Sequence, residues 1–515
     1  MLRLHRRPGQ QLRRSAGRRG VRRVNTFRKP RRFDRNLIVI GAGAGGLVTA
    51  YIAAAVKAKV TLIEGQRMGG DCLNTGCVPS KALIRAARML ADLRRAGEFG
   101  IHTEPPRVDF AAVMTRVRGV ISQVEPHDSV ERYTALGVEV IQGHARLTSP
   151  WTVEIDSNGE KRALSARAIV LATGAAPVIP AIPGIENVRH VTSDTVWSLD
   201  VLPERLAVLG GGPIGCELAQ AFAGLGSRVT LVARSALLGR EDAEVVARVE
   251  QGLAGDGVRL LKGADPLRCE VVDGKQHLVV GGKEGEEAIP FDVLLCATGR
   301  KARVEGFGLE ELGIPLTRSG TIEVNETLQT RHPSVYACGD AAGPYQFTHA
   351  AAHQAWYAAV NALFSGMLGP IGRFKVDYRV MPRVTFTRPE VARVGLNATE
   401  AKARGIAHEI TRYDLADLDR AITDGAAHGF VQVITPPGRD RILGVTIVGE
   451  HAGELLAEFT LAMKHGLGLN KIMGTVHPYP TWSEAAKYAA GEWKRAHAPR
   501  GLLAWLERFH AWRRG

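Results

Sequence analysis

The sequence has little cysteine, few aromatic residues and no long hydrophobic run, and each shortage argues against a class of protein. Six cysteines in 515 residues are too few for a disulfide scaffold, so a reducing, cytoplasmic setting is predicted. No uncharged apolar run approaches the roughly 20 residues of a membrane-spanning helix, so no transmembrane segment is expected. The hydrophobic content of 45% and aromatic content of 6% are typical of a globular protein. The length predicts about two to four domains.

Acidic residues are almost missing from the first 35 positions. These positions carry 14 lysines or arginines and one acid, Asp34, so they hold +13 of the net charge of +15. Because they contain almost no apolar residues to bury, residues 1–35 are predicted to form a basic disordered tail. An organelle-targeting peptide and weak binding to nucleic acid or an anionic membrane are alternatives. A solvated extension or an over-extended translation start is favoured, and no stable nucleic-acid partner is expected.

Two of the cysteines, Cys72 and Cys77, lie just before a helix-forming run at 81–90. A loop containing Gly76 can bring their sulfurs to bonding distance. Cys77 would then begin the helix, with Pro79 near its first turn, where the helix dipole and free N–H groups favour a thiolate. Half of a metal site and two buried structural cysteines are the alternatives. Zinc sites pair cysteines roughly two to four residues apart and need a second pair, so a redox dithiol is favoured and no metal ligands are predicted.

A glycine-rich turn follows the apolar run 37–40 and opens a helical stretch at 47–57. A second predicted strand at 60–63 ends on Glu64. In such a unit the glycines let the backbone approach a pyrophosphate, the helix N-terminus neutralises it, and the acid holds a ribose diol. The segment therefore predicts a dinucleotide site. The glycines of this fingerprint are Gly41, Gly43 and Gly46.

The same unit recurs with a strand at 206–209, a helix at 217–224 and a second strand at 228–232. Its glycines are Gly210, Gly212 and Gly215. The second strand is followed by Arg234 rather than an acid, and Arg240 lies six residues on. Since a carboxylate there would repel a 2′-phosphate and arginines would bind one, NADPH is predicted over NADH. The alternative is that both arginines are ordinary surface charges.

The order of these motifs resembles that of the FAD-dependent pyridine nucleotide–disulfide oxidoreductases, which include dihydrolipoamide dehydrogenase, glutathione reductase and mercuric reductase. Further landmarks of the resemblance are 172–177, 297–300, 336–340 and 386–392. The resemblance implies an α/β fold with two Rossmann-like dinucleotide-binding domains, for FAD and NAD(P), and a C-terminal α+β dimerisation domain. The implied boundaries are 36–185 for the first part of the FAD-binding domain, 186–300 for the NAD(P)-binding domain, 301–375 for the second part of the FAD-binding domain, and 376–500 for the dimerisation domain.

The resemblance also implies residue roles. Cys72 and Cys77 would form a redox disulfide, with Cys77 as the charge-transfer thiolate that faces the flavin and Cys72 as the interchange thiol that meets the acceptor. Lys81 would lie near the flavin with Glu217 as its partner. The residues expected to hold FAD or tune its ring are Gly41, Gly43, Gly46, Glu64, Lys81, Thr173, Gly174, Ala175, Glu217, Asp340, Gln346, Phe347, Thr348 and His349. Those expected to hold NADPH are Gly210, Gly212, Gly215, Arg234, Arg240 and Gly299.

The chain departs from the disulfide-reducing members near its C-terminus. Those members carry a motif resembling His-x-His-Pro-Thr-x-Ser-Glu, whose second histidine is the acid–base catalyst. Here that position is Tyr479, with Glu484 five residues later. The alternative acid–base residue is His477, two residues upstream of Tyr479. A phenol with a reference pKa of about 10 is a poor base near neutrality. Mercuric reductases also have a tyrosine near this place, but their C-terminal cysteine pair is missing here, since Cys338 is the last cysteine.

We therefore expect a homodimeric, FAD-dependent enzyme that passes electrons from NADPH through the Cys72–Cys77 disulfide to a metal ion, a quinone-like molecule or an atypical disulfide. Tyr479 and Glu484 would reach into the partner's site, as the family's residues do. The alternatives are a dihydrolipoamide dehydrogenase and a slow redox-sensing flavoprotein whose basic tail binds a partner. Residues 501–515 are expected to form an amphipathic helix that packs on its own dimer or, less commonly, touches a membrane.

Overall fold

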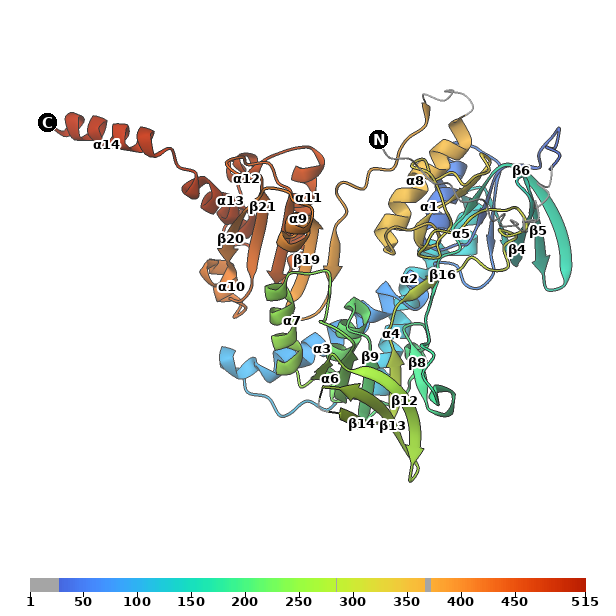
Figure 1. Ribbon diagram of the computed structural model, residues 1–515, viewed down its shortest axis with the longest axis horizontal. Helices are drawn as coiled ribbons and strands as arrows, with labels where there is room; N and C mark the ends of the chain where they lie inside the picture. The colour runs from blue at the N-terminus through green and yellow to red at the C-terminus, as the bar shows by residue number, and fades with distance from the viewer. Residues whose placement is uncertain (1–26, 284, 366–371) are drawn as a thin grey trace, which may run out of the picture.

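The computed structural model describes residues 27–283, 285–365 and 372–515. The chain forms two α/β domains built on parallel sheets and a C-terminal domain built on an antiparallel sheet (Figure 1), which confirms the predicted fold class. Residues 1–26 of the predicted tail lie outside the described residues. The end of that segment is packed, because Phe27 lies against a buried cluster and meets the His332 ring edge-on at 6.4 Å. Part of the segment described from residue 27 onward therefore contacts the N-terminal domain, and the boundary expected at residue 36 stays a prediction.

The N-terminal domain is built on a seven-stranded sheet. Its strands are β1 (Arg35–Ile40), β2 (Val60–Glu64), β3 (Val138–Gln142), β4 (His144–Ser149), β5 (Thr152–Ser157), β6 (Glu160–Leu171) and β17 (Val335–Ala337). Its helices are α1 (Ala44–Ala55), α2 (Gly70–Asn74), α4 (Phe110–Val124), α5 (Val130–Ala135) and α8 (Thr348–Phe364). Strand β1 pairs in parallel with β2 and β6. Its apolar residues are fully covered because Leu37 and Val39 face a cluster that includes α1 and α8, while Ile38 and Ile40 face the cluster on the other side.

The middle domain repeats this plan. Its strands are β8 (His190–Thr192), β9 (Arg205–Leu209), β10 (Arg228–Ala233), β11 (Arg259–Lys262), β12 (Asp265–Val272), β13 (Lys275–Gly282), β14 (Gly285–Phe291) and β15 (Val293–Cys296). The parallel order is β11-β10-β9-β15-β8, and β12 to β14 form an antiparallel sheet. Helices α6 (Pro213–Leu225) and α7 (Ala243–Gly255) belong to this domain. The short strands β7 (Ala175–Pro177) and β16 (Arg300–Ala302) pair where the chain passes between the two domains.

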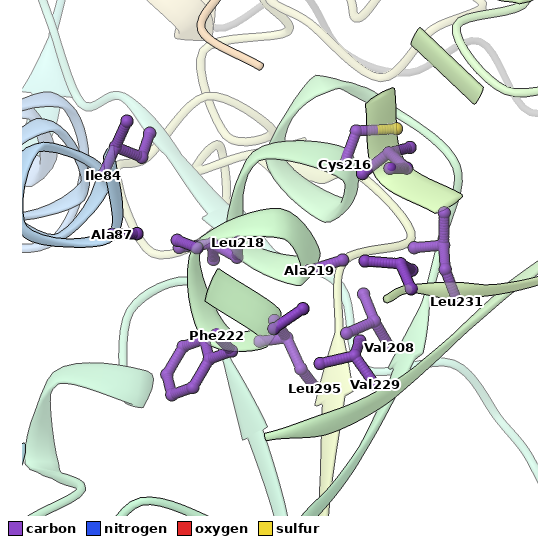
Figure 2. Close-up of a cluster of buried hydrophobic side chains, with 14 of the residues drawn as sticks. Ile84, Ala87, Val208, Cys216, Leu218, Ala219, Phe222, Val229, Leu231 and Leu295 are labelled. Atoms are coloured by element: carbon purple, nitrogen blue, oxygen red, sulfur yellow. The ribbon is translucent and has the colours of Figure 1, made fainter. Parts of the chain in front are cut away.

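A long helix, α3 (Cys77–Arg94), joins the first two domains by packing on α6. Figure 2 shows Ile84 and Ala87 of α3 facing α6, with Leu218 and Phe222 of α6 beside them and the sheet residues beneath. The two helices lie close together at Gly224, where an added Cβ would lie only 3.2 Å from the Ala87 Cβ. The missing side chain of Gly224 therefore permits the close approach. This packing fixes the start of α3 relative to the start of α6.

The C-terminal domain follows. Its strands are β18 (Arg383–Thr385), β19 (Glu390–Gly395), β20 (Glu409–Asp414), β21 (Phe430–Thr435) and β22 (Gly444–Gly449), in the order β18-β19-β22-β21-β20. Its helices are α9 (Ala398–Ala403), α10 (Asp419–Thr423), α11 (Ala452–Lys464), α12 (Leu469–Met473) and α13 (Glu484–Ala496). A last helix, α14 (Arg500–Arg514), extends away from this domain in Figure 1. Among the described residues, no helix is long and apolar enough to cross a membrane.

Candidate active site

The first glycine turn lets backbone segments approach where a side chain would not fit. Gly41 has φ +100°, and a Cβ there would lie 2.3 Å from the Ala172 carbonyl oxygen. A Cβ on Gly46 would lie 1.7 Å from the Gly41 carbonyl oxygen, so Gly46 lets α1 rest against the turn. The helix begins at Ala44, with Gly43 as its N-cap. Its first N–H groups are therefore available to an anion.

A cavity of about 680 Å³ runs from this turn to the second half of the domain. At one end the buried Glu64 carboxylate accepts the N–H groups of Ala42 at 2.6 Å and Gln66 at 2.7 Å. The predicted cofactor residues that line the cavity are Gly41, Gly43, Glu64, Thr173, Gly174, Asp340 and Thr348. Ala175 lies behind it, fully buried, with its carbonyl accepting from Arg300 at 3.0 Å. The glycine turn, the helix N-terminus and the fixed carboxylate fit an adenine dinucleotide.

The second glycine turn has the same construction. Gly210 has φ +126°, and its Cβ would lie 2.3 Å from the Ala297 carbonyl oxygen, while a Cβ on Gly215 would lie 1.9 Å from the Gly210 carbonyl oxygen. Gly212 caps α6 and has open space around it. A cavity of about 1310 Å³ opens beside this turn. The predicted site residues that line it are Cys72, Cys77, Lys81, Gly212, Glu217, Arg240, Gly299, Asp340, Gln346, Phe347, Thr348 and His349.

The structure separates the two arginines predicted to read the nucleotide. Arg240 lines the larger cavity. Arg234 is exposed at the end of β10, and its Nε lies 3.5 Å from Asp265 Oδ1. The Arg240 carbonyl accepts from Arg393 Nη2 and Asn397 Nδ2, each at 3.0 Å. These two residues of the C-terminal domain thus hold the Arg240 loop, a contact that no sequence motif signalled.

The two cysteines lie at the junction of the two cavities. Cys72 is on α2 and lines both cavities, while Cys77 is the first residue of α3 and lines the larger one. Both are free thiols in the structure. A hydrogen bond from the Cys72 thiol lowers the pKa of Cys77 to about 6, although burial of the Cys77 thiol acts to raise that pKa. The same hydrogen bond, together with burial, raises the pKa of Cys72 above its usual range. The pair is therefore one thiolate next to one thiol near neutral pH.

Two further groups support the Cys77 thiolate. The Thr348 hydroxyl lies 3.3 Å from Cys77 Sγ and also lowers the pKa of that thiol. Lys81 is one turn along α3, and its Nζ donates to Glu217 Oε2 at 2.8 Å. The other Glu217 oxygen accepts from the Phe386 N–H at 3.0 Å, and Lys81 Nζ lies 4.2 Å from the Phe386 ring centre. The packing of α3 on α6 therefore places the implied Lys81–Glu217 pair in contact.

The second half of the N-terminal domain closes the site. Burial raises the pKa of Asp340 to about 6, and the Arg300 charge opposes this shift. Arg300 contacts the Asp71 carboxylate and lies 3.2 Å from Asp194 Oδ1. At the start of α8, the rings of the N-cap residue Phe347 and of His349 stack with centroids 5.2 Å apart. The site thus has a polar wall of ion pairs and an aromatic wall.

The C-terminal motif lies elsewhere in the single chain. Tyr479 is 68% exposed, and its hydroxyl donates to Asp419 Oδ2 at 2.9 Å, which raises the Tyr479 pKa. Glu484 is buried and accepts from the Tyr488 hydroxyl at 3.3 Å. Neither Tyr479 nor Glu484 is among the described residues that line the two cavities. Within the described ranges, no cluster of three or more His, Cys, Asp or Glu side chains could hold a metal ion.

Family models cover most of the chain. Residues 35–355 match the model described as pyridine nucleotide-disulphide oxidoreductase. Residues 381–490 match the dimerisation domain of the same description.

Relatives and solved structures agree with these matches. The chain is 34% identical to a mercuric reductase of Streptomyces lividans over 88% of its own length and 95% of that protein. It is also 34% identical to a dihydrolipoyl dehydrogenase of Chlamydia muridarum, over 88% of its own length and 96% of that protein. Its fold is similar to LpdA from Mycobacterium tuberculosis, with a TM-score of 0.81, 28% identity and coverage of 88% and 99%. Its fold is also similar to that of the HOCl-induced flavoprotein disulfide reductase RclA from Escherichia coli in a Cu(II) complex, with a TM-score of 0.78 and 25% identity. That match covers 89% of this chain and 99% of the RclA chain. The relatives therefore divide between two activities at equal identity.

Proposed function

Because the chain belongs to the pyridine nucleotide-disulphide oxidoreductase family and is an FAD-dependent oxidoreductase, we propose that it passes two electrons from NADPH to a soft metal ion or an atypical disulfide through Cys72 and Cys77. The observation that carries this proposal is the unequal thiol pair at the junction of the two cavities. A thiolate is the reactive form of sulfur toward both disulfides and soft metals. A purely structural pair would not need one thiol held as an anion at the edge of a large cavity.

Different residues of the chain would have different roles in this electron transfer. FAD, when bound, supplies the chemistry that turns a hydride from the nucleotide into an electron pair for the cysteines. Gly41, Gly43 and Glu64 would hold its adenylate half, and Lys81 with Glu217 would place a positive charge near its ring. Reduction of the Cys72–Cys77 disulfide takes up two electrons and breaks one S–S bond, leaving a thiolate at Cys77 and, with one proton, a thiol at Cys72. A disulfide acceptor then returns the pair to the disulfide by exchange.

NADPH is the proposed nucleotide because the second strand of the middle domain ends without an acid. Arg240 at the larger cavity supplies a positive charge for a 2′-phosphate. Arg234 faces solvent next to Asp265 and would contribute only after its side chain turns toward the nucleotide. We therefore assign the main contact to Arg240.

The acceptor is proposed from what the C-terminal motif lacks. Tyr479 stands where an acid–base histidine would be, and its raised pKa makes it a weaker base still. His477 is held from both ring nitrogens, with Nε2 3.1 Å from Glu458 and Nδ1 3.0 Å from the Thr475 carbonyl. A soft metal ion binds cysteine as the thiolate and displaces the Cys72 proton on binding, so it needs no proton donor for a thiol leaving group. The match of residues 381–490 to a dimerisation domain supports a homodimer in which Tyr479 and Glu484 approach the partner's cysteines.

The test is an anaerobic assay of the purified enzyme. NADPH or NADH is supplied, and Hg²⁺, oxidised lipoamide and a quinone are offered in separate runs. We expect fast oxidation of NADPH with Hg²⁺ and slow turnover with lipoamide, and loss of Hg²⁺ turnover in Cys72→Ser and Cys77→Ser variants. A protein that purifies without flavin, or one that reduces Hg²⁺ equally well without either cysteine, would contradict the proposal.

Dihydrolipoyl dehydrogenase activity is the second candidate, because a relative with that activity has the same identity of 34%. It predicts NADH preference and rapid lipoamide turnover despite Tyr479. A redox sensor that acts through the basic tail is distinguished by deletion of residues 1–35. An enzyme of the proposed kind keeps its turnover rate after this deletion, whereas a tail-directed sensor loses its partner.

A further inference from the structure

The last helix of the chain exposes a large apolar surface. No residue of α14 is buried, and Figure 1 shows it running away from the C-terminal domain. Its exposed apolar side chains include Trp505 at 58% and Trp512 at 77%, with Leu502 and Leu503 about half exposed. A contiguous apolar surface of this kind marks a binding surface in a folded protein.

Most large apolar residues of α14 lie on one face. Five of them recur at steps of three and four residues, which is the spacing of one helix face: Leu502, Trp505, Leu506, Phe509 and Trp512. Leu503 lies outside this face. The rings confirm this arrangement, since Trp505 stacks on Phe509 at 5.5 Å and Phe509 lies 6.1 Å from Trp512. The opposite face carries Arg500, Glu507 and Arg514. Arg508 lies three residues after Trp505 and four before Trp512, so it borders the apolar face.

The charges of α14 select the kind of partner. The helix has four arginines against one acid, Glu507. The Arg513 guanidinium lies 5.9 Å from the Phe509 ring centre, so a cation borders the apolar face itself. Tryptophan and arginine together are typical of segments at the headgroup level of a bilayer, where rings enter the acyl boundary and cations meet anionic lipid. An anionic membrane surface supplies phosphate groups that can meet the Arg513 guanidinium while the rings enter the acyl boundary.

The length of α14 decides how it would meet a bilayer. Its 15 residues span only about 22 Å at the α-helical rise, which is shorter than the roughly 30 Å hydrocarbon core. It also lies beyond residue 490, where the match to the dimerisation domain ends. We propose that α14 is a surface anchor that lies in the plane of an anionic membrane with Trp505, Phe509 and Trp512 inserted. This inference is independent of the proposed acceptor.

The test is co-sedimentation of the full-length holoenzyme with vesicles of phosphatidylcholine and phosphatidylglycerol, compared with vesicles of phosphatidylcholine alone. We expect binding to the anionic vesicles that weakens as salt is added. Trp505→Ala with Trp512→Ala should lower the partition coefficient about ten-fold or more, because each buried ring contributes strongly. Arg513→Gln with Arg514→Gln should lower it about 25-fold, since each cation near an anionic surface contributes about five-fold.

Matched controls separate α14 from the rest of the chain, which matters because residues 1–35 are also basic. Trp356→Ala removes a half-exposed tryptophan of α8, and Arg318→Gln with Arg439→Gln removes two exposed arginines elsewhere. These controls should bind like wild type. No vesicle binding by the full chain would overturn the proposal, as would wild-type binding by the double tryptophan variant. Conversion of that variant to a monomer with vesicle binding intact would also overturn it, because the face would then cover a second copy of the chain. NADPH turnover measured on the same samples reports on the proposed function separately.

Discussion

The two nucleotide-type domains share one construction and differ at one place. In each, a glycine with positive φ approaches the carbonyl of a neighbouring strand end, and a later glycine lets the helix touch the turn. In the N-terminal domain the second strand ends on Glu64, a buried carboxylate held by two backbone N–H groups. In the middle domain it is followed by the exposed Arg234. The shared glycine turn fits the pyrophosphate common to both nucleotides, and the residue that follows the second strand is the proposed basis for a difference in which nucleotide binds.

The two cavities differ in their volume and in the domains that line them. The smaller one, about 680 Å³, ends at a fixed carboxylate within one domain. The larger one, about 1310 Å³, is lined by residues of all three domains, including Arg240 and Lys464. Apart from Asp194, the described lining of the smaller cavity comes from the N-terminal domain, and such a site suits a cofactor that stays bound. A site shared between domains suits a nucleotide that comes and goes.

The largest expected effect comes from filling the first glycine turn. Gly46→Ala places a Cβ 1.7 Å from the Gly41 carbonyl oxygen, so α1 must move off the turn and the purified protein should lack flavin absorbance. Gly212→Ala is the matched control, because open space surrounds that position, and it should keep its flavin. Flavin retained at wild-type level in Gly46→Ala would break the argument that this turn holds the cofactor.

The next effect concerns the link between the middle and C-terminal domains. Arg393 is fully buried, with Nε 2.8 Å from Glu241 and Nη1 2.9 Å from Glu400. Arg393→Met leaves two carboxylates without their cation, so the free energy of unfolding should fall by about 3–5 kcal/mol. Arg439→Met, on the surface, should leave it nearly unchanged. Denaturant unfolding measures both, and equal stability of the two variants would contradict a clamp at Arg393.

Nucleotide choice gives a smaller effect. Arg240→Ala should raise the KM for NADPH about ten-fold and leave the KM for NADH unchanged, because it removes one charge-assisted contact to a 2′-phosphate. Arg234→Ala should change the KM for NADPH less, since Arg234 does not line the cavity in the structure. Steady-state kinetics with both nucleotides measures these KM values and shows whether Arg240→Ala changes the KM for NADPH more than Arg234→Ala does. Loss of affinity for NADH to the same extent would assign Arg240 to the shared part of the nucleotide.

The smallest effect concerns the thiol itself. With a Cys77 pKa of about 6, the thiolate fraction and the rate of alkylation by iodoacetamide should rise with pH and reach half of their maximum near pH 6. Thr348→Val removes a hydroxyl that lowers this pKa, so the midpoint should move to higher pH and the rate at pH 6 should fall about two- to three-fold. Thr348→Ser keeps the hydroxyl and should keep the midpoint. Mass spectrometry of the reduced protein locates the modified residue.

Local patterns predicted the elements of this fold well. The strands expected at 37–40 and 60–63 are β1 and β2, each longer by one or two residues. Helix α1 begins at Ala44 rather than at 47, because glycines that form the turn also continue into the helix. Such ends depend on capping geometry rather than on the apolar pattern.

Contacts between distant segments were harder to predict. Thr348 was expected to hold the flavin, and its contact with Cys77 joins positions 271 residues apart. Arg393 belongs to no motif, and its role emerges only when β19 packs against the Arg240 loop. Tyr479 lies outside both cavities of the single chain, so its predicted approach to the cysteines would require a second copy of the chain.

The close contact between Ala87 of α3 and Gly224 of α6 has a consequence for how the protein opens. Two helices that touch at this distance and share one buried cluster, which includes Leu218 and Phe222, cannot separate without exposing that core. They should therefore form a single cooperative unit, and their amide hydrogens should exchange with solvent together rather than helix by helix. Fluctuations that loosen the middle domain would then reach Cys77 directly, which couples the reactivity of the thiolate to the local stability of a neighbouring domain.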